Sequence, residues 1–259
     1  MFIKKVVGVT VYISIITLFV FGCMNIKSSV GNKNIEIYFH ENVDERYRIG
    51  VENYVFLIKK HQMELGCDDV TIDPICIPQV TSTATGLVFS SDENSLFILT
   101  AAHFCKRYPI PGTSESIFGI AKDQERILYI LSMDEESDIC LLMGVKYKNE
   151  SFNQVKLELS VPIIGSDVYT VASPNSISGQ GLRPVFTGKF AGCNQTNCMT
   201  TIPATFGSSG AGIYTSEGKL ITIVMAVTEG FENLVLSPSQ EDLHKFILTI
   251  DSVVDIYQY

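Results

Sequence analysis

Short runs of β-branched, aliphatic and aromatic residues, separated by turn-forming residues, recur along the chain from about residue 81 onward. Runs of this length and spacing are typical of antiparallel strands, whereas βαβ units would alternate them with long amphipathic helices. The pattern therefore predicts a mainly β protein, with ten strands at Gly86–Ser90, Leu96–Ala101, Ile117–Ala121, Arg126–Leu131, Ile139–Val145, Val168–Ala172, Val185–Phe190, Gly212–Tyr214, Leu220–Thr228 and Leu234–Leu236.

Two segments outside this region carry a helical period instead. Between Val43 and Met63 apolar side chains recur every three or four residues, which predicts an amphipathic helix in an N-terminal extension. A second helix, over about 237–250, is predicted to begin at Ser237, because serine caps a helix, Pro238 fits its first turn and Gln240 takes the capping-box position. Its buried stripe comprises Leu243, Phe246, Ile247 and Ile250.

The first 23 residues read as an export signal. Lys4 and Lys5 precede an uncharged apolar run from Val6 to Met24, which is a basic region followed by a hydrophobic one. Three fates stay open: the run ends at a lipid-modified Cys23 in a sequence that resembles a bacterial lipobox, it remains as a membrane anchor, or it is simply cleaved. Each fate places the remaining chain outside the cytoplasm: a tethered form in the periplasm or at the cell surface, and a cleaved form secreted. Residues 24–66 are read as a polar tether followed by the helix.

Composition excludes several classes of protein. Hydrophobic residues make up 46% of the 259 residues and charged residues 18%, so the chain can bury a core and is neither disordered nor fibrous. The net charge of −9 leaves no basic field for phosphates, and no nucleic-acid partner is expected.

The seven cysteines agree with export. If Cys23 carries lipid, six remain, and this even number permits disulfides, which persist mainly outside the cytoplasm. Cys193 and Cys198 flank a turn-forming stretch and could close a small hairpin, and Cys67 could pair with Cys76 or Cys105. Buried thiols are the alternative, and we expect one at Cys140, inside an apolar strand. No Cys/His spacing resembles a zinc site, and neither metal nor cofactor is expected.

Three segments carry candidate chemistry. The apolar strand that ends in Thr100-Ala101-Ala102 leads into His103, and Asp138 stands at the mouth of another apolar strand, where burial would require a donor such as an imidazole N–H. The third is the small-residue stretch 205–212, in which the amides of Gly207 and Ser209 could converge on a developing oxyanion.

Together the three segments resemble the trypsin-like serine peptidases of the chymotrypsin fold. Thr100-Ala101-Ala102-His103 matches T-A-A-H, Asp138-Ile139-Cys140-Leu141 matches D-[IL]-A-L, and Gly207-Ser208-Ser209-Gly210-Ala211 is similar to G-[DN]-S-G-G. The order His, Asp, Ser is that of this family and differs from subtilisin and the α/β-hydrolases. The separations of 35 and 71 residues look closest to HtrA-like and phage or viral members.

The resemblance implies a double antiparallel β-barrel within residues 67–259, with barrel one over about 67–150 and barrel two over about 151–236. It implies a polypeptide substrate, with Ser209 as nucleophile, His103 as general base, Asp138 as the group that orients the imidazole, and the Gly207 and Ser209 amides as oxyanion hole. By analogy the pocket for the side chain before the scissile bond (P1) has Pro203 at its base, with walls at Ala204 and at Val224, Met225 and Ala226. None of these is charged, so a small or medium apolar P1 residue is expected.

Two departures from the family pattern stand out. Ser208 replaces the aspartate that pairs with a newly cut N-terminus in digestive members, so activation by that charge pair is not expected. Ala211 replaces the second glycine. The leading interpretation is an exported, membrane-tethered serine endopeptidase; the alternatives are a catalytically silent binding protein on the same fold and a structural surface lipoprotein in which the match is coincidence.

Overall fold

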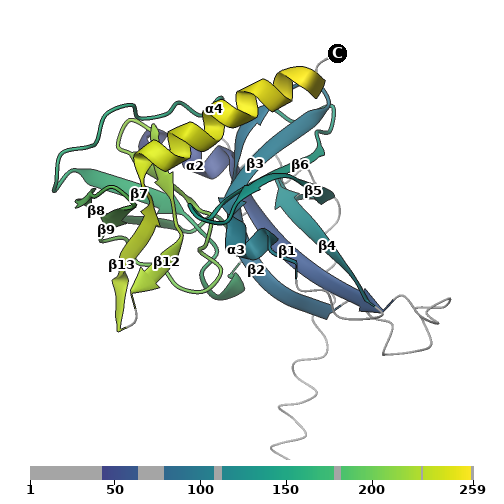
Figure 1. Ribbon diagram of the computed structural model, residues 1–259, viewed down its shortest axis with the longest axis horizontal. Helices are drawn as coiled ribbons and strands as arrows, with labels where there is room; N and C mark the ends of the chain where they lie inside the picture. The colour runs from purple at the N-terminus through teal and green to yellow at the C-terminus, as the bar shows by residue number, and fades with distance from the viewer. Residues whose placement is uncertain (1–42, 64–78, 108–112, 178–181, 229, 258–259) are drawn as a thin grey trace, which may run out of the picture. The chain divides into compact units, whose positions relative to one another are not determined.

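The computed structural model describes residues 43–63, 79–107, 113–177, 182–228 and 230–257. Two β lobes follow one another in the chain, and a long helix closes it (Figure 1). The first lobe is a closed six-stranded barrel in the order β1-β2-β3-β6-β5-β4, and the second is a seven-stranded sheet in the order β11-β10-β7-β8-β9-β13-β12. The mainly β, chymotrypsin-like prediction is confirmed.

Every pair of neighbouring strands in the barrel is antiparallel. The barrel closes where the first strand meets the fourth, with Phe56 opposite Ile120. Closure leaves no unpaired strand edge in this lobe. Its elements are β1 (Tyr54–Met63), β2 (Gln79–Ser91), β3 (Ser95–Ala101), the short helix α3 (Ala102–Cys105), β4 (Thr113–Ala121), β5 (Gln124–Asp134) and β6 (Ile139–Val145).

The helix predicted over Val43–Met63 is largely wrong. Only the 3-10 turn η2 (Glu45–Tyr47) and the short helix α2 (Arg48–Glu52) are helical, and Tyr54–Met63 is strand β1. The physical reason is that residues 53–57 are all buried, with β2 and β4 on either side of the strand, so the apolar spacing does not mark one face of a helix, and β-branched and aromatic residues favour a strand once partners lie on both sides. Barrel one therefore starts before residue 67, within the region assigned to the extension.

Strand β3 is buried on both faces, and its side chains alternate between two cores. Leu96 and Ile98 point into the barrel, where they pack with Leu142 of β6. Phe97 and Leu99 belong to a second cluster, which includes side chains from the other lobe and from the last helix. This central position explains why the strand leading to His103 reads as an unbroken apolar run.

The second lobe contains seven strands. The predicted strand Leu220–Thr228 is interrupted at Val224 and Met225, which separates two strands that lie at opposite ends of the sheet order. Its elements are β7 (Asp167–Val171), the 3-10 turn η4 (Pro174–Ser176), β8 (Val185–Cys193), β9 (Asn197–Thr200), β10 (Gly212–Thr215), β11 (Leu220–Ile223), β12 (Ala226–Thr228) and β13 (Phe231–Pro238).

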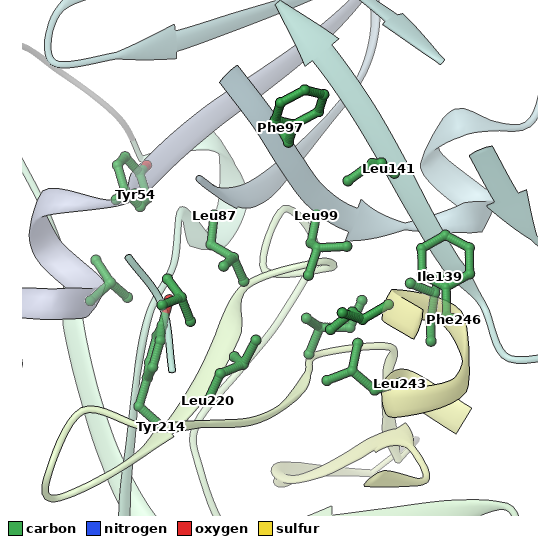
Figure 2. Packing of buried hydrophobic residues seen from close by; sticks show 14 of the residues in the cluster. Tyr54, Leu87, Phe97, Leu99, Ile139, Leu141, Tyr214, Leu220, Leu243 and Phe246 are labelled. Atoms are coloured by element: carbon green, nitrogen blue, oxygen red, sulfur yellow. The ribbon is translucent and has the colours of Figure 1, made fainter. Parts of the chain in front are cut away.

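A shared hydrophobic cluster joins the lobes. Figure 2 shows Leu87 and Leu99 from the barrel near Leu220 from the second lobe, with Leu243 and Phe246 of the last helix, α4 (Gln240–Tyr257), at the same cluster. Each of these side chains is at least 93% buried. The predicted apolar stripe of α4 is therefore confirmed as the part that packs on the lobes.

The start of α4 lies later than predicted. Ser237 and Pro238 extend β13, where they pair with Cys198 and Asn197 of β9. The cap is Ser239 instead: its hydroxyl accepts the backbone N–H of Asp242 at 3.1 Å and donates to the Asp242 carboxylate at 2.6 Å. This is the capping arrangement, shifted by two residues because strand pairing holds the earlier serine.

The segment ahead of β1 contacts both lobes. Asn53 is fully buried, and its side-chain N–H groups donate to Val88 O of β2 and to Asn153 O in the connection between the lobes. The Tyr47 ring meets the Tyr169 ring of the second lobe edge-on, with centroids 5.1 Å apart. Within the described ranges, no helix has the length and apolar character that crossing a bilayer requires.

Candidate active site

His103 and Asp138 are brought together by strand register. β3 pairs with β6 so that Ala101 lies opposite Ile139, which places the residues just beyond the end of one strand and just before the other side by side. The carboxylate of Asp138 receives His103 Nδ1 at 2.8 Å through Oδ2 and the His103 backbone N–H at 2.7 Å through Oδ1. These two bonds fix both the position and the ring orientation of the histidine.

The turn before β6 holds Asp138 in a conformation that few residues adopt. Its φ of 53° lies in the left-handed region, where aspartate is among the better tolerated side chains. Its carbonyl accepts the N–H of Ala102 at 3.1 Å. The Asp138 side chain is 15% exposed and that of His103 is 50% exposed, so the carboxylate is shielded while the imidazole faces outward.

A disulfide lies directly beneath this pair. Cys105, on α3, is bonded to Cys140, on β6, and both are fully buried. The expectation of a free thiol at Cys140 is wrong, as is a pairing of Cys105 with Cys67, because the helical turn α3, which follows β3, packs Cys105 against β6. Cys193 and Cys198 form the predicted hairpin disulfide. Cys23, Cys67 and Cys76 lie outside the described residues.

Ser209 is fastened to the first lobe through its backbone. Its carbonyl accepts the N–H of Thr85 on β2 at 2.9 Å. The next residue, Gly210, has φ of +83°, and a Cβ there would clash with Thr100 Oγ1 and with Thr85 O. Glycine is required at this close approach. Since Thr100 lies on β3, three residues before His103 in the short helix that follows, the serine loop is anchored on the strand that leads to the histidine.

The peptide groups that carry the Gly207 and Ser209 amides are oriented by hydrogen bonds to their carbonyl oxygens. Phe206 O accepts the N–H of Asn175 at 2.6 Å, and Ser208 O accepts the N–H of Ala211 at 3.0 Å. A trans peptide directs its N–H opposite to its C=O, so the amides of Gly207 and Ser209 point away from these acceptors. Within the described ranges neither amide donates a hydrogen bond, which leaves both available to an oxyanion. Nothing in the sequence marks Asn175 as a residue that orients the Gly207 amide.

The side chain of Ser209 is less constrained than its backbone. Among the described residues, neither its hydroxyl nor His103 Nε2 makes a hydrogen bond. Such bonds commonly tighten only when substrate is bound.

The predicted pocket residues are split between surface and core. Pro203 and Ala226 are exposed, Ala204 is buried, and Val224 packs in the core of the second lobe. Val224 nevertheless borders the serine loop, because its carbonyl accepts the N–H of Gly210 at 2.7 Å, and Met225 donates its N–H to Leu236 O. Phe206, which sequence reasoning did not assign, is 88% exposed beside Gly207, and its exposure is visible only in the structure.

The buried phenol of Tyr54 lies near the serine loop, where it contacts Ser173. The Tyr54 hydroxyl shares a hydrogen bond with Ser173 Oγ, and burial raises the pKa of Tyr54 to about 12 even though the Arg183 guanidinium stacks over its ring. In the described part of the chain there is no cluster of three or more His, Cys, Asp or Glu that could hold a metal ion.

Two β lobes with a histidine–aspartate pair and a small-residue loop at their junction define the class of trypsin-like serine peptidases. The family model of the trypsin-like peptidase domain matches residues 84–223, more than half of the chain, and the protein belongs to this family. The crystal structure of the serine endoprotease from Yersinia pestis is similar, with a TM-score of 0.58 and 16% identity over 79% of this chain and 65% of that chain. A comparison with curated proteins finds no match.

Proposed function

We propose that this protein is an exported serine endopeptidase that cleaves polypeptides through an acyl-enzyme intermediate, with His103, Asp138 and Ser209 as its triad. The observation that carries the proposal is the doubly hydrogen-bonded His103–Asp138 pair beside a serine loop whose two amides are turned outward. Family membership supports the reaction class.

The chemistry follows from the positions of the groups. Asp138 accepts Nδ1–H, so the second ring nitrogen, Nε2, carries a free lone pair and serves as the general base. It takes the proton of Ser209 as Oγ attacks the carbonyl carbon, and later gives that proton to the leaving amine. The Gly207 and Ser209 amides stabilise the negative oxygen of the tetrahedral intermediate, and losing one such donor generally costs about 2.7–4 kcal/mol of transition-state stabilisation.

The side chains that border the serine loop support an apolar P1 preference. The predicted pocket contains no charged group, and the exposed Phe206 ring adds an apolar surface beside Gly207. A peptide-library cleavage assay tests this preference: cleavage after small or medium apolar residues is expected, and a dominant preference for Lys or Arg would contradict it.

Export is supported by the two disulfides, since such bonds persist mainly outside the cytoplasm. Tethering through a lipid on Cys23 or through the apolar segment 6–24 belongs to the same proposal. Metabolic labelling with a fatty acid, compared between the wild type and Cys23→Ala, separates the two: label that disappears in the variant indicates the lipid, and equal membrane retention without label indicates the anchor.

A fluorophosphonate probe tests the catalytic proposal directly. We expect labelling at Ser209, mapped by mass spectrometry, that is lost in Ser209→Ala and in His103→Ala but persists in Ser208→Ala. The neighbouring Ser208 is a matched control because its side chain is 99% buried. Absence of labelling in folded protein would favour the alternative, a silent binding protein on this fold.

A further inference from the structure

Thr85 connects the barrel to three separate segments around the candidate site. It lies on β2, is fully buried, and uses its backbone and side chain in four hydrogen bonds. The backbone N–H donates to Ser209 O at 2.9 Å, and the carbonyl accepts Thr100 Oγ1 at 2.8 Å. The hydroxyl donates to Gly207 O at 2.8 Å and accepts the N–H of Ser173 at 3.0 Å.

The Thr85 hydroxyl makes two of these hydrogen bonds, which an apolar strand residue could not make. It sits between two pieces of the second lobe, the chain leaving β7 at Ser173 and the turn at Gly207, and satisfies one polar group on each. These pieces are already in close contact, because a Cβ on Gly207 would clash with Ser173 O. An apolar side chain at position 85 would leave a buried donor and a buried acceptor unpaired, which native proteins avoid.

Gly207 is thereby held on both sides of its α-carbon. The preceding peptide is oriented by the bond from Asn175 N–H to Phe206 O, and the following one by the Thr85 hydroxyl on Gly207 O. With φ of +89°, Gly207 has the conformational freedom of glycine, so the direction of its amide depends on the hydrogen bonds to the two flanking peptides, which include the bond from Ser208 N–H to Thr205 O.

The neighbouring residue supports this peptide through its backbone, because the Ser208 N–H donates to Thr205 O at 3.0 Å, but its side chain adds little. Ser208 is 99% buried, and its hydroxyl accepts only a long bond of 3.4 Å from Thr205 N–H. Family members that order this loop with a buried aspartate have a charge pair here. In this chain the loop has no such charge pair, so neutral hydrogen bonds must order it.

We infer that Thr85 is a positioning residue for the oxyanion hole: its hydroxyl, between Ser173 N–H and Gly207 O, holds the Gly207 amide in the direction that stabilises the tetrahedral intermediate. The inference rests on the proposed peptidase function. The barrel would then contribute to transition-state stabilisation as well as carrying the histidine and the aspartate.

The test compares Thr85→Val with Thr85→Ser. Valine keeps the branched shape and both backbone bonds but removes the hydroxyl, whereas serine retains the hydroxyl. Thr222→Val is the matched control, because Thr222 is equally buried and its hydroxyl donates to one carbonyl, Pro238 O, at 2.9 Å, away from the serine loop. The readout is saturation kinetics of a fluorophosphonate probe, which separates the maximal labelling rate from the binding constant, with circular dichroism as the folding check.

Thr85→Val is expected to lower the maximal labelling rate about 10- to 100-fold, less than the ~10²–10³ lost when a donor is removed outright, with the binding constant within about threefold. Thr85→Ser should stay near the wild type, and Thr222→Val should lose thermal stability without losing rate. Should valine prevent folding, Thr85→Ala carries the same expectation.

Three results would overturn the inference. One is a labelling rate unchanged in Thr85→Val, and another is a rate in Thr85→Ser as low as in the valine variant, since the hydroxyl would then not be the active part. Folded wild type that is never labelled at Ser209 would overturn the proposed function itself and the role of Thr85 with it, which distinguishes the two failures.

Discussion

Cys105 and Cys140, which form a disulfide, each lie two residues beyond a member of the hydrogen-bonded pair His103 and Asp138. Both cysteines are fully buried, so the covalent bond makes a second connection between the same two segments in the interior. The β3–β6 ladder already sets the spacing of the pair, with Ala101 opposite Ile139. We therefore assign the disulfide chiefly to stability.

The double variant Cys105→Ala/Cys140→Ala should lose about 3–4 kcal/mol of unfolding free energy, because the bond closes a loop of 35 residues in the unfolded chain. Its maximal fluorophosphonate labelling rate should stay within about threefold of the wild type while it remains folded. The equivalent change at Cys193 and Cys198, which close a separation of only 5, should cost about 2 kcal/mol. Denaturant unfolding measures both. A large loss of rate in a folded protein would contradict this assignment.

Asp138→Asn should reduce turnover about 10³- to 10⁴-fold with little loss of stability. The amide can still accept from the His103 backbone, but its NH₂ group would face Nδ1, which forces the ring proton onto Nε2 and removes the base. Asp134→Asn is the control, because Asp134 Oδ1 caps only the turn, at Glu136 and Ser137. Full activity in Asp138→Asn would exclude this role for the aspartate.

Gly210→Ala should abolish activity and cost several kcal/mol of stability, because the added methyl would clash with Thr100 and Thr85 in the fixed backbone of the barrel. Gly165→Ala separates this clash from backbone strain. Gly165 also has positive φ, +92°, but nothing lies within 4 Å of its added methyl, so only about 1 kcal/mol is expected. Equal costs in the two variants, measured by denaturant unfolding, would refute the close-approach argument.

Arg126→Met should destabilise the protein by about 3–5 kcal/mol. Its guanidinium is 2% exposed, pairs with the buried carboxylate of Glu150 and donates to backbone carbonyls of the barrel, so its loss leaves a buried charge without a partner. Lys189→Met, which breaks the exposed pair with Asp167, should cost less than about 1 kcal/mol. Chemical denaturation of both variants provides the comparison, and a mild effect at Arg126 would contradict the prediction.

Buried tyrosines predict an alkaline unfolding transition. Burial raises the pKa of Tyr54 and of Tyr169 to about 12, from 10.0, and that of Tyr214 further. Their stabilising contribution is complete below pH 10, where both folded and unfolded states are protonated, and is lost between pH 10 and 12, where only the unfolded chain ionises.

Ultraviolet titration should show these phenols ionising together with loss of structure. Tyr214→Phe should move the midpoint to higher pH, and Tyr129→Phe, which changes an exposed ring, should not. A titration in which all tyrosines ionise while the fold persists would disprove the coupling.

The strands around the site could be predicted from sequence because their patterns are local. The predicted strand Ile139–Val145 has the same bounds as β6, since a run buried on both faces shows no helical period. Tyr54–Met63 could not be, because its strand character depends on β2 and β4, which follow it in the chain. The Cys105–Cys140 bond could not be predicted for the same reason: it depends on how α3 packs against β6, across a separation of 35 residues.

The residues of the site that could be predicted from sequence are those whose side chains have a recognisable chemical function. His103 and Asp138 were found through an imidazole and a carboxylate at strand ends, and the structure joins them. Thr85 and Asn175 act through a hydroxyl and a backbone amide inside ordinary-looking segments, so their contribution exists only once the two lobes are packed together.

Strand β1 sets the size of the smallest fragment that can fold. The family match begins at residue 84, yet the barrel is closed by Tyr54–Met63, which pairs with β2 on one side and β4 on the other. A fragment trimmed to 84–223 would expose rows of unpaired N–H and C=O groups on two strands, the form of surface that recruits other chains into aggregates. It would also lack α4, whose apolar face covers the junction of the lobes. The cooperative unit therefore runs from about residue 43 to 257, well beyond the stretch by which the family is recognised.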